Sequence, residues 1–304
     1  MKLSVVIPSR GNWSRLKLTL DALVKQSLPA HVGWEVLIVL DGVSLKGELN
    51  FQHSLPALRY LPLPRRGGRG AARNAGIAAA RGEIIVLLDD DVVVNPGFLT
   101  AHLAQQVQSP SLCHGPMSEL PALVWIDDVS WAETTTDGNG LPRRIREWAA
   151  RVLRDLSDPI ICREKHGRPS RLERDGMEAF RQGRSALAWV AFAGANLSAP
   201  RKWLLDDGFD ERPGTRWGLE DLSLALRWHL WGLPLTVAAD AWGLHLSHPR
   251  PAWRESQRAN LCCLDFLPED VALSILAYLE GKIMPDELES VLLALNTSQV
   301  AGTT

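Results

Sequence analysis

Three consecutive acids, Asp89, Asp90 and Asp91, follow a strongly apolar run at residues 84–88. Hard divalent cations prefer oxygen ligands, and alternate carboxylates at a strand end can reach one ion. Three adjacent acids also repel one another unless a cation or solvent relieves the repulsion. The triplet therefore predicts a cation site. The structural alternative is a solvated turn, or acids that cap a helix before Pro96.

A second acidic pair, Glu220 and Asp221, stands at the start of a run with helical periodicity, after a turn that contains Trp217. A carboxylate beside a substrate can take a proton as a general base. Acids also stabilise helix N-termini, which is the structural alternative. Two histidines, His245 and His248, follow the next apolar run, and they could bind a metal or be structural.

Apolar runs alternate with helical patterns in the first part of the chain. The expected strands are residues 3–7, 35–40, 58–61, 84–88 and 235–239. The expected helices are residues 12–26, 71–80, 96–107, one from 200, 219–231, 259–266, 269–279 and 286–295. Strands that alternate with helices predict an α/β fold with a mostly parallel central sheet flanked by helices.

Polar residues follow several of these strands. In parallel sheets, ligands bind beyond the carboxyl ends of the strands. Pro8 and Arg10 follow the first strand, Asp41 ends the second, and the acid triplet ends the strand at residues 84–88. We therefore expect these groups, which are distant in sequence, to line one site.

Composition excludes several classes of protein. The net charge of −2 in 304 residues favours neither nucleic acid nor a membrane surface. The four cysteines form no CxxC pair, so neither a disulfide framework nor a zinc cluster is indicated, and a reducing, cytoplasmic setting is expected. No apolar run is long enough to predict a membrane-spanning helix.

The pattern weakens between residues 109 and 186. Eleven arginines and one lysine lie between Arg143 and Arg184. Residues 140–186 are therefore interpreted as a basic insertion, either solvated and partly mobile or a lid that binds an anionic acceptor. Residues 251–304 are expected to form a helical C-terminal extension of a domain that covers residues 1–250.

Six short motifs, in this order and spacing, resemble the family 2 glycosyltransferases and their relatives with the Rossmann-like GT-A fold. The motifs are SVVIPSR at 4–10, EVLIVLDG at 35–42, GAARNAGI at 70–77, GEIIVLLDDD at 82–91, GFDE at 208–211 and WGLED at 217–221. The resemblance implies that the chain transfers a sugar from a nucleoside diphosphate sugar, expected to be UDP-linked, to an acceptor hydroxyl, with inversion.

The resemblance also implies roles for individual residues. Pro8, Arg10 and Asp41 would line the base and ribose of the donor, with Arg73 and Asn74 near the base and diphosphate. Asp89 and Asp91 would be the family's DxD motif, with Asp90 beside the donor and Asp91 as the surest ligand of Mn²⁺ or Mg²⁺. The donor-side residues expected in this way are Pro8, Arg10, Asp41, Arg73, Asn74, Asp89 and Asp90.

On the acceptor side, Asp221 would be the catalytic base and Glu220 would hold acceptor hydroxyls, together with Trp217 and Asn196. Residues 217–248 resemble the galactosyltransferases and the polypeptide N-acetylgalactosaminyltransferases, in which a third metal ligand lies here. His245 fits that place better than His248. Because side chains alternate along an extended segment, only one of the two histidines is expected to reach the metal.

Two other classes of protein share part of this pattern. A nucleotidyltransferase also uses an α/β sheet and acidic metal ligands, but its basic glycine-rich loop is missing after residues 3–7. A non-catalytic nucleotide-sugar binder is disfavoured by the intact Asp91 and Asp221. The acceptor could be a glycan, a lipid-linked group, a peptide or a small molecule. Peripheral membrane contact and a homodimer through the C-terminal helices stay open as partners, and nucleic acid is not expected.

Overall fold

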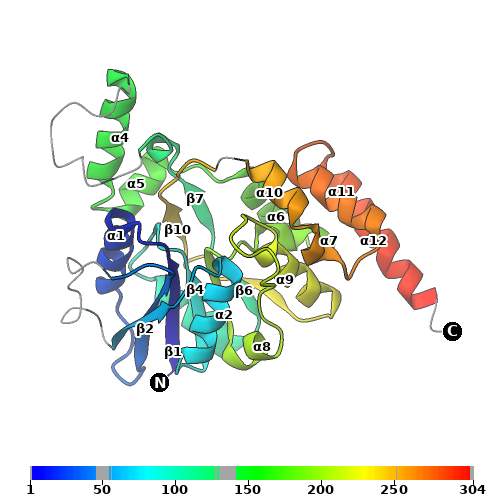
Figure 1. Ribbon diagram of the computed structural model, residues 1–304, viewed down its shortest axis with the longest axis horizontal. Coiled ribbons are helices and arrows are strands. Elements are labelled where there is room, and N and C mark those ends of the chain that lie inside the picture. Colours follow the sequence, from blue (N-terminus) through cyan, green and yellow to red (C-terminus); the bar gives the residue numbers. More distant parts are fainter. Residues whose placement is uncertain are drawn as a thin grey trace.

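The computed structural model describes residues 2–45, 55, 57–126, 129, 142–250 and 252–301, with side chains up to residue 295. A mixed central sheet has helices on both faces (Figure 1), which confirms the expected α/β architecture. The strands are β1 (Leu3–Ser9), β2 (Trp34–Asp41), β3 (Leu58–Leu63), β4 (Ile84–Leu88), β5 (Val92–Val94), β6 (Leu112–His114), β7 (Met117–Glu119), β8 (Asn196–Pro200), β9 (Leu235–Val237) and β10 (Gly243–His245).

The helices extend over more of the second half of the chain than the pattern predicted. The α-helices are α1 (Trp13–Val24), α2 (Arg69–Ala79), α3 (Phe98–Gln108), α4 (Arg143–Asp155), α5 (Pro159–His166), α6 (Arg171–Arg181), α7 (Ser185–Ala188), α8 (Arg201–Asp206), α9 (Glu220–Leu230), α10 (Trp253–Ala259), α11 (Glu269–Leu279) and α12 (Pro285–Ala301). Three 3₁₀ turns among the described residues are η1 (Pro121–Leu123), η3 (Trp189–Ala191) and η4 (Leu261–Leu264).

Within the described residues, seven strands form the main sheet in the order β3-β2-β1-β4-β8-β6-β9. β1 pairs in parallel with β2 and β4, and β2 pairs in parallel with β3. β8 runs antiparallel to both of its neighbours, β4 and β6. The carboxyl ends of β1, β2 and β4 therefore meet at one edge, as expected.

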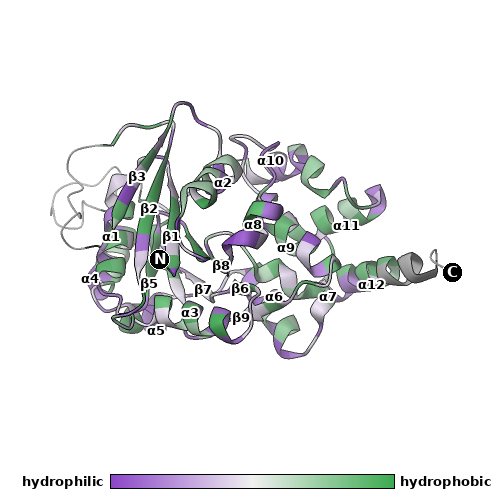
Figure 2. Cartoon of the chain, turned by 90° about the horizontal axis from the view of Figure 1, so that it is seen from below, coloured by the Kyte–Doolittle hydropathy of each residue, from purple (hydrophilic) through white to green (hydrophobic). Residues whose placement is uncertain are grey.

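Alternate side chains of β1 enter two different cores. Leu3, Val5 and Ile7 join the core that contains the apolar faces of α1 and α3. Val6 joins the opposite core with residues of α2, α9 and α11. Apolar residues are concentrated in the strands and on the helix faces that cover them (Figure 2). Burial on both faces explains why β1, β2 and β4 are continuous apolar runs rather than alternating ones.

A small second sheet lies beside the carboxyl end of β4. Its strands, in the order β5-β10-β7, have only three residues each. His245 is paired with Val92 on β5 and with Glu119 on β7. The backbone N–H of Leu246 also donates to the carbonyl oxygen of Asp91 at 2.8 Å. Strand pairing therefore brings segments around residues 91, 119 and 245 together.

The basic segment contains α4, α5 and α6, although its pattern predicted no elements. α4 buries Ala149 and Val152 in the same core as η1, and α6 packs against α7 and η3. In Figure 1, α4 rises beside and above the sheet.

The C-terminal part is helical, as expected, with one correction. The prediction of a single helix over residues 259–266 is wrong, because α10 ends at Ala259 and η4 follows. Asn260, between the two elements, is buried, and its side chain donates to the backbone of the turn before α9. None of the described helices is long and apolar enough to cross a membrane.

Candidate functional site

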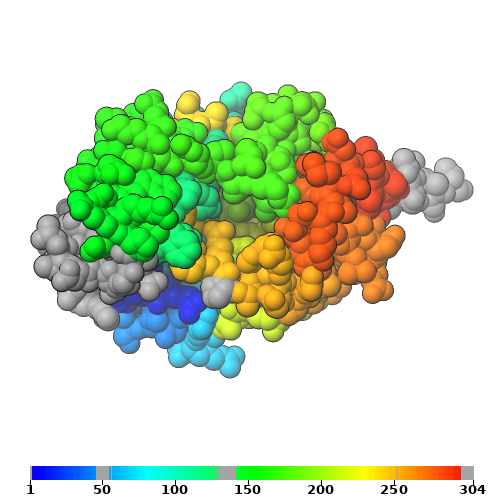
Figure 3. All heavy atoms as spheres, turned by 90° about the horizontal axis from the view of Figure 1, so that it is seen from above, coloured from blue at the N-terminus to red at the C-terminus, as the bar shows by residue number. Residues whose placement is uncertain are grey.

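A cavity of about 1100 Å³ lies at the carboxyl ends of β1, β2 and β4. Seen from above, the surface is hollowed between the green segments that include α4 to α6 and the orange C-terminal segments (Figure 3). Its lining includes Pro8, Arg10, Asp41, Arg73, the acid triplet, Trp217, Asp221 and both histidines. The structure therefore brings most of the expected site residues to one place.

One carboxylate and two imidazoles converge on one side of this cavity. Nε2 of His245 and Nε2 of His248 each lie 3.4 Å from Oδ2 of Asp91. One ligand atom from each residue lies within 4.8 Å of the others, a spacing that can hold one metal ion. A donor set of one oxygen and two nitrogens suits Mn²⁺ and similar ions better than Mg²⁺.

The expectation that His245 and His248 face opposite sides is wrong. Their ring centroids are 5.4 Å apart. β10 ends at His245, so the regular alternation of side chains stops before residue 248. Asp89, expected as a second carboxylate ligand, is not part of this cluster, because its Oδ1 accepts a hydrogen bond from Nη2 of Arg73 at 2.9 Å.

Glu119 orients His245, and sequence analysis did not find it. Nδ1 of His245 and Oγ of Ser247 both donate to Oε2 of Glu119 at 2.6 Å. A hydrogen bond at Nδ1 leaves Nε2 for a metal, an arrangement common around metal-bound histidines. β7 has three residues and no pattern of its own, so no signal in the sequence marks Glu119.

The charges of this cluster shift each other's pKa. Burial acts to raise the pKa of Asp91, but His245 and His248 outweigh it and hold the pKa well below its usual range. Burial acts to lower the pKa of His245, but Asp91 and Glu119 raise it to about 10. Burial also raises the pKa of Glu119, yet His245 and Arg250 lower it to about 2. Without a cation, His245 therefore carries the positive charge between two carboxylates.

Asp90 lies between the two outer acids and has a different environment. Oγ of Ser9 donates to its Oδ2 at 2.5 Å. Burial and the charge of Asp91 raise the pKa of Asp90 to about 7.

A buried arginine links the acid triplet to α9. Nη2 of Arg73 donates to Asp89, and Nη1 donates to Oε1 of Glu220 at 3.1 Å. The guanidinium also stacks on the ring of Phe209, with Cζ 5.1 Å from the ring centroid. A Cβ at residue 194 would lie only 2.6 Å from Cζ of Arg73. The guanidinium can therefore occupy this position only because residue 194 is a glycine.

The two acids at the start of α9 are placed differently. Asp221 lines the cavity, and its Oδ2 accepts from the backbone N–H of Gly194 at 2.9 Å. Glu220 is buried behind Arg73, outside the described cavity lining, so its expected contact with acceptor hydroxyls stays a prediction without support from this geometry. Burial and the charge of Asp221 raise the pKa of Glu220, and its Oε2 has no hydrogen-bond partner among the described residues.

Asp41 lines the cavity and also holds the turn before α2. Its Oδ1 and Oδ2 accept from the backbone N–H groups of Gly67 and Gly68 at 2.6 and 3.0 Å. Burial and the nearby charge of Arg66 lower the pKa of Arg10, which lines the same end of the cavity.

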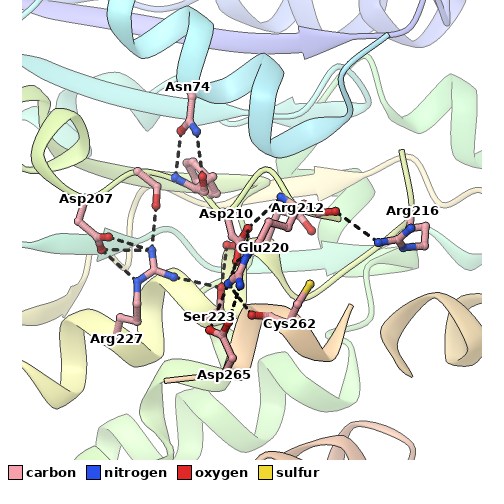
Figure 4. Close-up of polar contacts among 12 residues, drawn as sticks. Asn74, Asp207, Asp210, Arg212, Arg216, Glu220, Ser223, Arg227, Cys262 and Asp265 are labelled. Atoms are coloured by element: carbon pink, nitrogen blue, oxygen red, sulfur yellow. Dashed lines mark hydrogen bonds and ion pairs between the residues drawn. The ribbon is translucent and has the colours of Figure 1, made fainter. Parts of the chain in front are cut away.

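Two other expected site residues do not reach the cavity. Asn74 donates to the carbonyl oxygen of Phe209 and accepts from the N–H of the same residue (Figure 4). It also donates to Glu211. Asn196 is fully buried, donates to the carbonyl oxygen of Ala241, and pairs with His102. Both amides are used inside the protein, so the donor contact of Asn74 and the acceptor contact of Asn196 stay predictions without support from the cavity lining.

Trp217 stands at the cavity between two guanidinium groups. Cζ of Arg69 and Cζ of Arg250 lie 5.7 and 5.3 Å from its ring centroid. The side chain of Asn260 donates to the carbonyl oxygens of Trp217 and Gly218 at 3.1 and 2.8 Å. The C-terminal segment thus fixes the backbone that carries Trp217.

The loop before Trp217 is anchored on two further sides (Figure 4). Arg227 of α9 binds Asp207 through both carboxylate oxygens at 3.2 Å. Arg212 pairs with Asp210 and Asp265, the latter just after η4. The wall of the cavity that carries Trp217 therefore depends on both α9 and the C-terminal segment.

Comparison with known proteins agrees with this geometry. Residues 4–116 match the family model described as Glycosyl transferase family 2. The uncharacterized glycosyltransferase YwdF of Bacillus subtilis (strain 168) is 31% identical over 115 residues, which cover 38% of this chain and 41% of YwdF. The match thus spans less than half of that relative's length.

Two solved structures share the fold of nearly the whole chain. The crystal structure of S. aureus TarS 1-349 in complex with UDP-GlcNAc has a TM-score of 0.54 at 18% identity, and the match covers 93% of this chain and 72% of that one. The mannosyltransferase PcManGT from Pyrobaculum calidifontis, in complex with GDP-Man and Mn²⁺, has a TM-score of 0.56 at 15% identity, with 98% and 75% covered. These likenesses give the chain a GT-A fold, and the family match covers residues 4–116 of it.

Proposed function

We propose that this chain is an inverting glycosyltransferase that moves a sugar from a UDP-sugar to an acceptor hydroxyl with the help of a divalent cation. The observation that carries the proposal is one cavity lined both by the cluster of Asp91, His245 and His248 and by the carboxylate of Asp221. The complexes of the structural neighbours with UDP-GlcNAc and with GDP-Man and Mn²⁺ also support it.

The donor would lie along the carboxyl ends of β1, β2 and β4. Pro8, Arg10 and Asp41 would contact the base and ribose, and the acid triplet would flank the diphosphate. Asp89 would act mainly through its ion pair with Arg73, which holds both groups in place.

The donor set of Asp91, His245 and His248 fits a divalent cation, with Mn²⁺ favoured over Mg²⁺ by the two imidazoles. When bound there, the cation would neutralise the charge of the departing diphosphate. Glu119 would keep the proton of neutral His245 on Nδ1, so that Nε2 is free to coordinate. This use of His245 follows the resemblance to the galactosyltransferase group.

Asp221 would be the catalytic base. Its carboxylate would take the proton of the acceptor hydroxyl while the oxygen attacks the anomeric carbon, and the bond from that carbon to the diphosphate oxygen breaks. The hydrogen bond from Gly194 holds Oδ2 of Asp221 at the cavity. Glu220 would instead support Arg73 from behind.

Trp217 would provide a face for an acceptor or donor sugar ring. We also propose that residues 1–250 form the catalytic domain and residues 251–304 an extension that braces the acceptor side, through Asn260. A cytoplasmic location, a homodimer through the C-terminal helices and the absence of nucleic-acid partners stay predictions.

A thermal-shift panel of UDP- and GDP-sugars, with and without Mn²⁺, tests this proposal. We expect UDP-sugars with Mn²⁺ to raise the Tm most, and slow hydrolysis of the same donor to accompany binding. If no nucleotide sugar raises the Tm with either Mn²⁺ or Mg²⁺, the proposed function is wrong. Binding without any donor hydrolysis or transfer would indicate a non-catalytic binder.

A further inference from the structure

We propose that the outer face of α4 is a docking surface for an anionic lipid bilayer. α4 has the sequence RRIREWAARVLRD, with five arginines against one glutamate and one aspartate. Ala149 and Val152 are fully buried, so they mark the face of α4 that packs against the protein. Arg144, Trp148 and Arg151, spaced i, i+4 and i+7, are exposed together on another face of the helix.

The two acids of α4 are paired with basic side chains. Glu147 pairs with Arg143 at 2.6 Å, and Asp155 pairs with Lys165 and His166 of α5. The guanidinium groups of Arg144, Arg151 and Arg154 make no hydrogen bond or ion pair with any residue that the structure describes, although the charge of Arg151 also acts on Glu147. A protein with a net charge of −2 thus presents a local surface of unpaired guanidinium groups.

Large apolar side chains accompany these charges. Trp148 exposes 37% of its surface, and Trp125, just after η1, exposes 59%. η1 packs against α4, so Trp125 belongs to the same part of the molecule. Exposed indole rings beside arginines match the interface of a bilayer, where an apolar layer lies beneath anionic headgroups. An acidic protein or a nucleic acid could also contact arginines and indoles, so the test below uses vesicles alone, with neither of these partners present.

α4 lies at the same end of the sheet as the cavity. β1 begins at the bottom of Figure 1, and α4 rises beyond the upper, carboxyl end of the sheet, where the cavity lies. A chain adsorbed through α4 would hold the cavity close to the lipid surface. That a lipid-borne acceptor then reaches the cavity rests on the proposed function, whereas the adsorption itself does not.

Co-sedimentation with vesicles tests the proposal. The full chain should bind vesicles of phosphatidylcholine with phosphatidylglycerol, bind pure phosphatidylcholine vesicles far more weakly, and be released by high salt. The double variant Arg144→Ala/Arg151→Ala should lower partitioning roughly 30-fold, given the usual contribution of an arginine at an anionic surface. Trp148→Ala should also weaken binding, but should leave the salt dependence unchanged.

A matched control removes the same charge elsewhere. Arg81 and Lys202 are exposed near the amino-terminal end of β4, at the opposite end of the sheet, and Arg81→Ala/Lys202→Ala should bind like the wild type. Arg144→Lys/Arg151→Lys keeps the charge and should retain binding, which separates lost charge from a damaged helix. Equal loss in both alanine variants, or no preference of the wild type for anionic vesicles, would overturn the proposal. Neither result bears on donor binding, so the proposed function is judged separately.

Discussion

Nδ1 of His245 donates to Oε2 of Glu119 at 2.6 Å, and Nε2 of the same ring lies 3.4 Å from Oδ2 of Asp91. The imidazole therefore bridges two carboxylates, one from the last residue of β7 and one from the residue just before β5. The carboxylate of Glu119 sets the orientation of the ring through Nδ1, and the carboxylate of Asp91 lies beside Nε2. This relationship makes Glu119 the first residue to test in the proposed metal site.

Glu119→Gln keeps the shape of the side chain but removes its charge. We expect Mn²⁺ affinity in the presence of UDP to fall about 10- to 100-fold, the usual range for losing an outer partner of a metal-bound histidine. Titration calorimetry measures it, with the exposed Glu164→Gln as control. Wild-type affinity in Glu119→Gln would mean that Glu119 does not orient a metal ligand.

Both histidines should contribute to cation binding, since both Nε2 atoms lie equally close to Asp91. We expect His245→Ala and His248→Ala each to weaken Mn²⁺ activation and to move the preference towards Mg²⁺, because imidazole favours the softer ion. Activity measured against Mn²⁺ concentration for both variants decides it. An unchanged curve for His248→Ala would leave Asp91 and His245 as the ligands from this cluster.

Cation affinity should rise with pH. The pKa of His245 is raised to about 10, so at neutral pH the ring is protonated and must lose its proton before Nε2 can coordinate. Each pH unit below that pKa should weaken Mn²⁺ binding up to about tenfold, because one proton is exchanged for the ion. Affinities measured between about pH 6 and about pH 8 test this expectation. The slope should flatten in His245→Ala, and an equally steep slope there would assign the proton to another group.

Asp221→Asn should preserve donor affinity and lower kcat by about two to four decades, the range for losing a general base. Parallel measurements of UDP-sugar binding and of turnover separate the two effects. Asp240→Asn, at an exposed acid, serves as the control. Turnover near that of the wild type would remove Asp221 from the role of base.

Gly194→Ala should destabilise the protein by about 1–3 kcal/mol, because the new Cβ would overlap the guanidinium of Arg73. Displacement of Arg73 would also disturb Asp89 and Glu220. Denaturant unfolding gives the change in the free energy of unfolding. Gly97→Ala is the control, since its φ is −89° and the nearest atom to its added Cβ is 3.5 Å away. Equal stability of the two variants would show that Arg73 moves aside without cost.

Much of the sheet could be predicted from the sequence, because each of its main strands is a short apolar run that can be recognised locally. β1, β2 and β4 are apolar runs buried on both faces, and each ends in polar residues. Parallel strands share one carboxyl edge, so the meeting of Arg10, Asp41 and Asp91 at the cavity followed from order along the chain. The start of α9 at Glu220 also agreed with its helical periodicity.

The tertiary structure alone decided which polar groups face the cavity. Asn74, Asn196 and Glu220 are of types suited to a binding site, but they bind backbone groups, His102 or Arg73 inside the protein instead of lining the cavity. Glu119 and His248 come close to Asp91 and His245 only because three-residue strands pair across more than a hundred positions of sequence. Strands that short have no periodicity of their own, and a side chain's partners depend on which distant segments pack beside it.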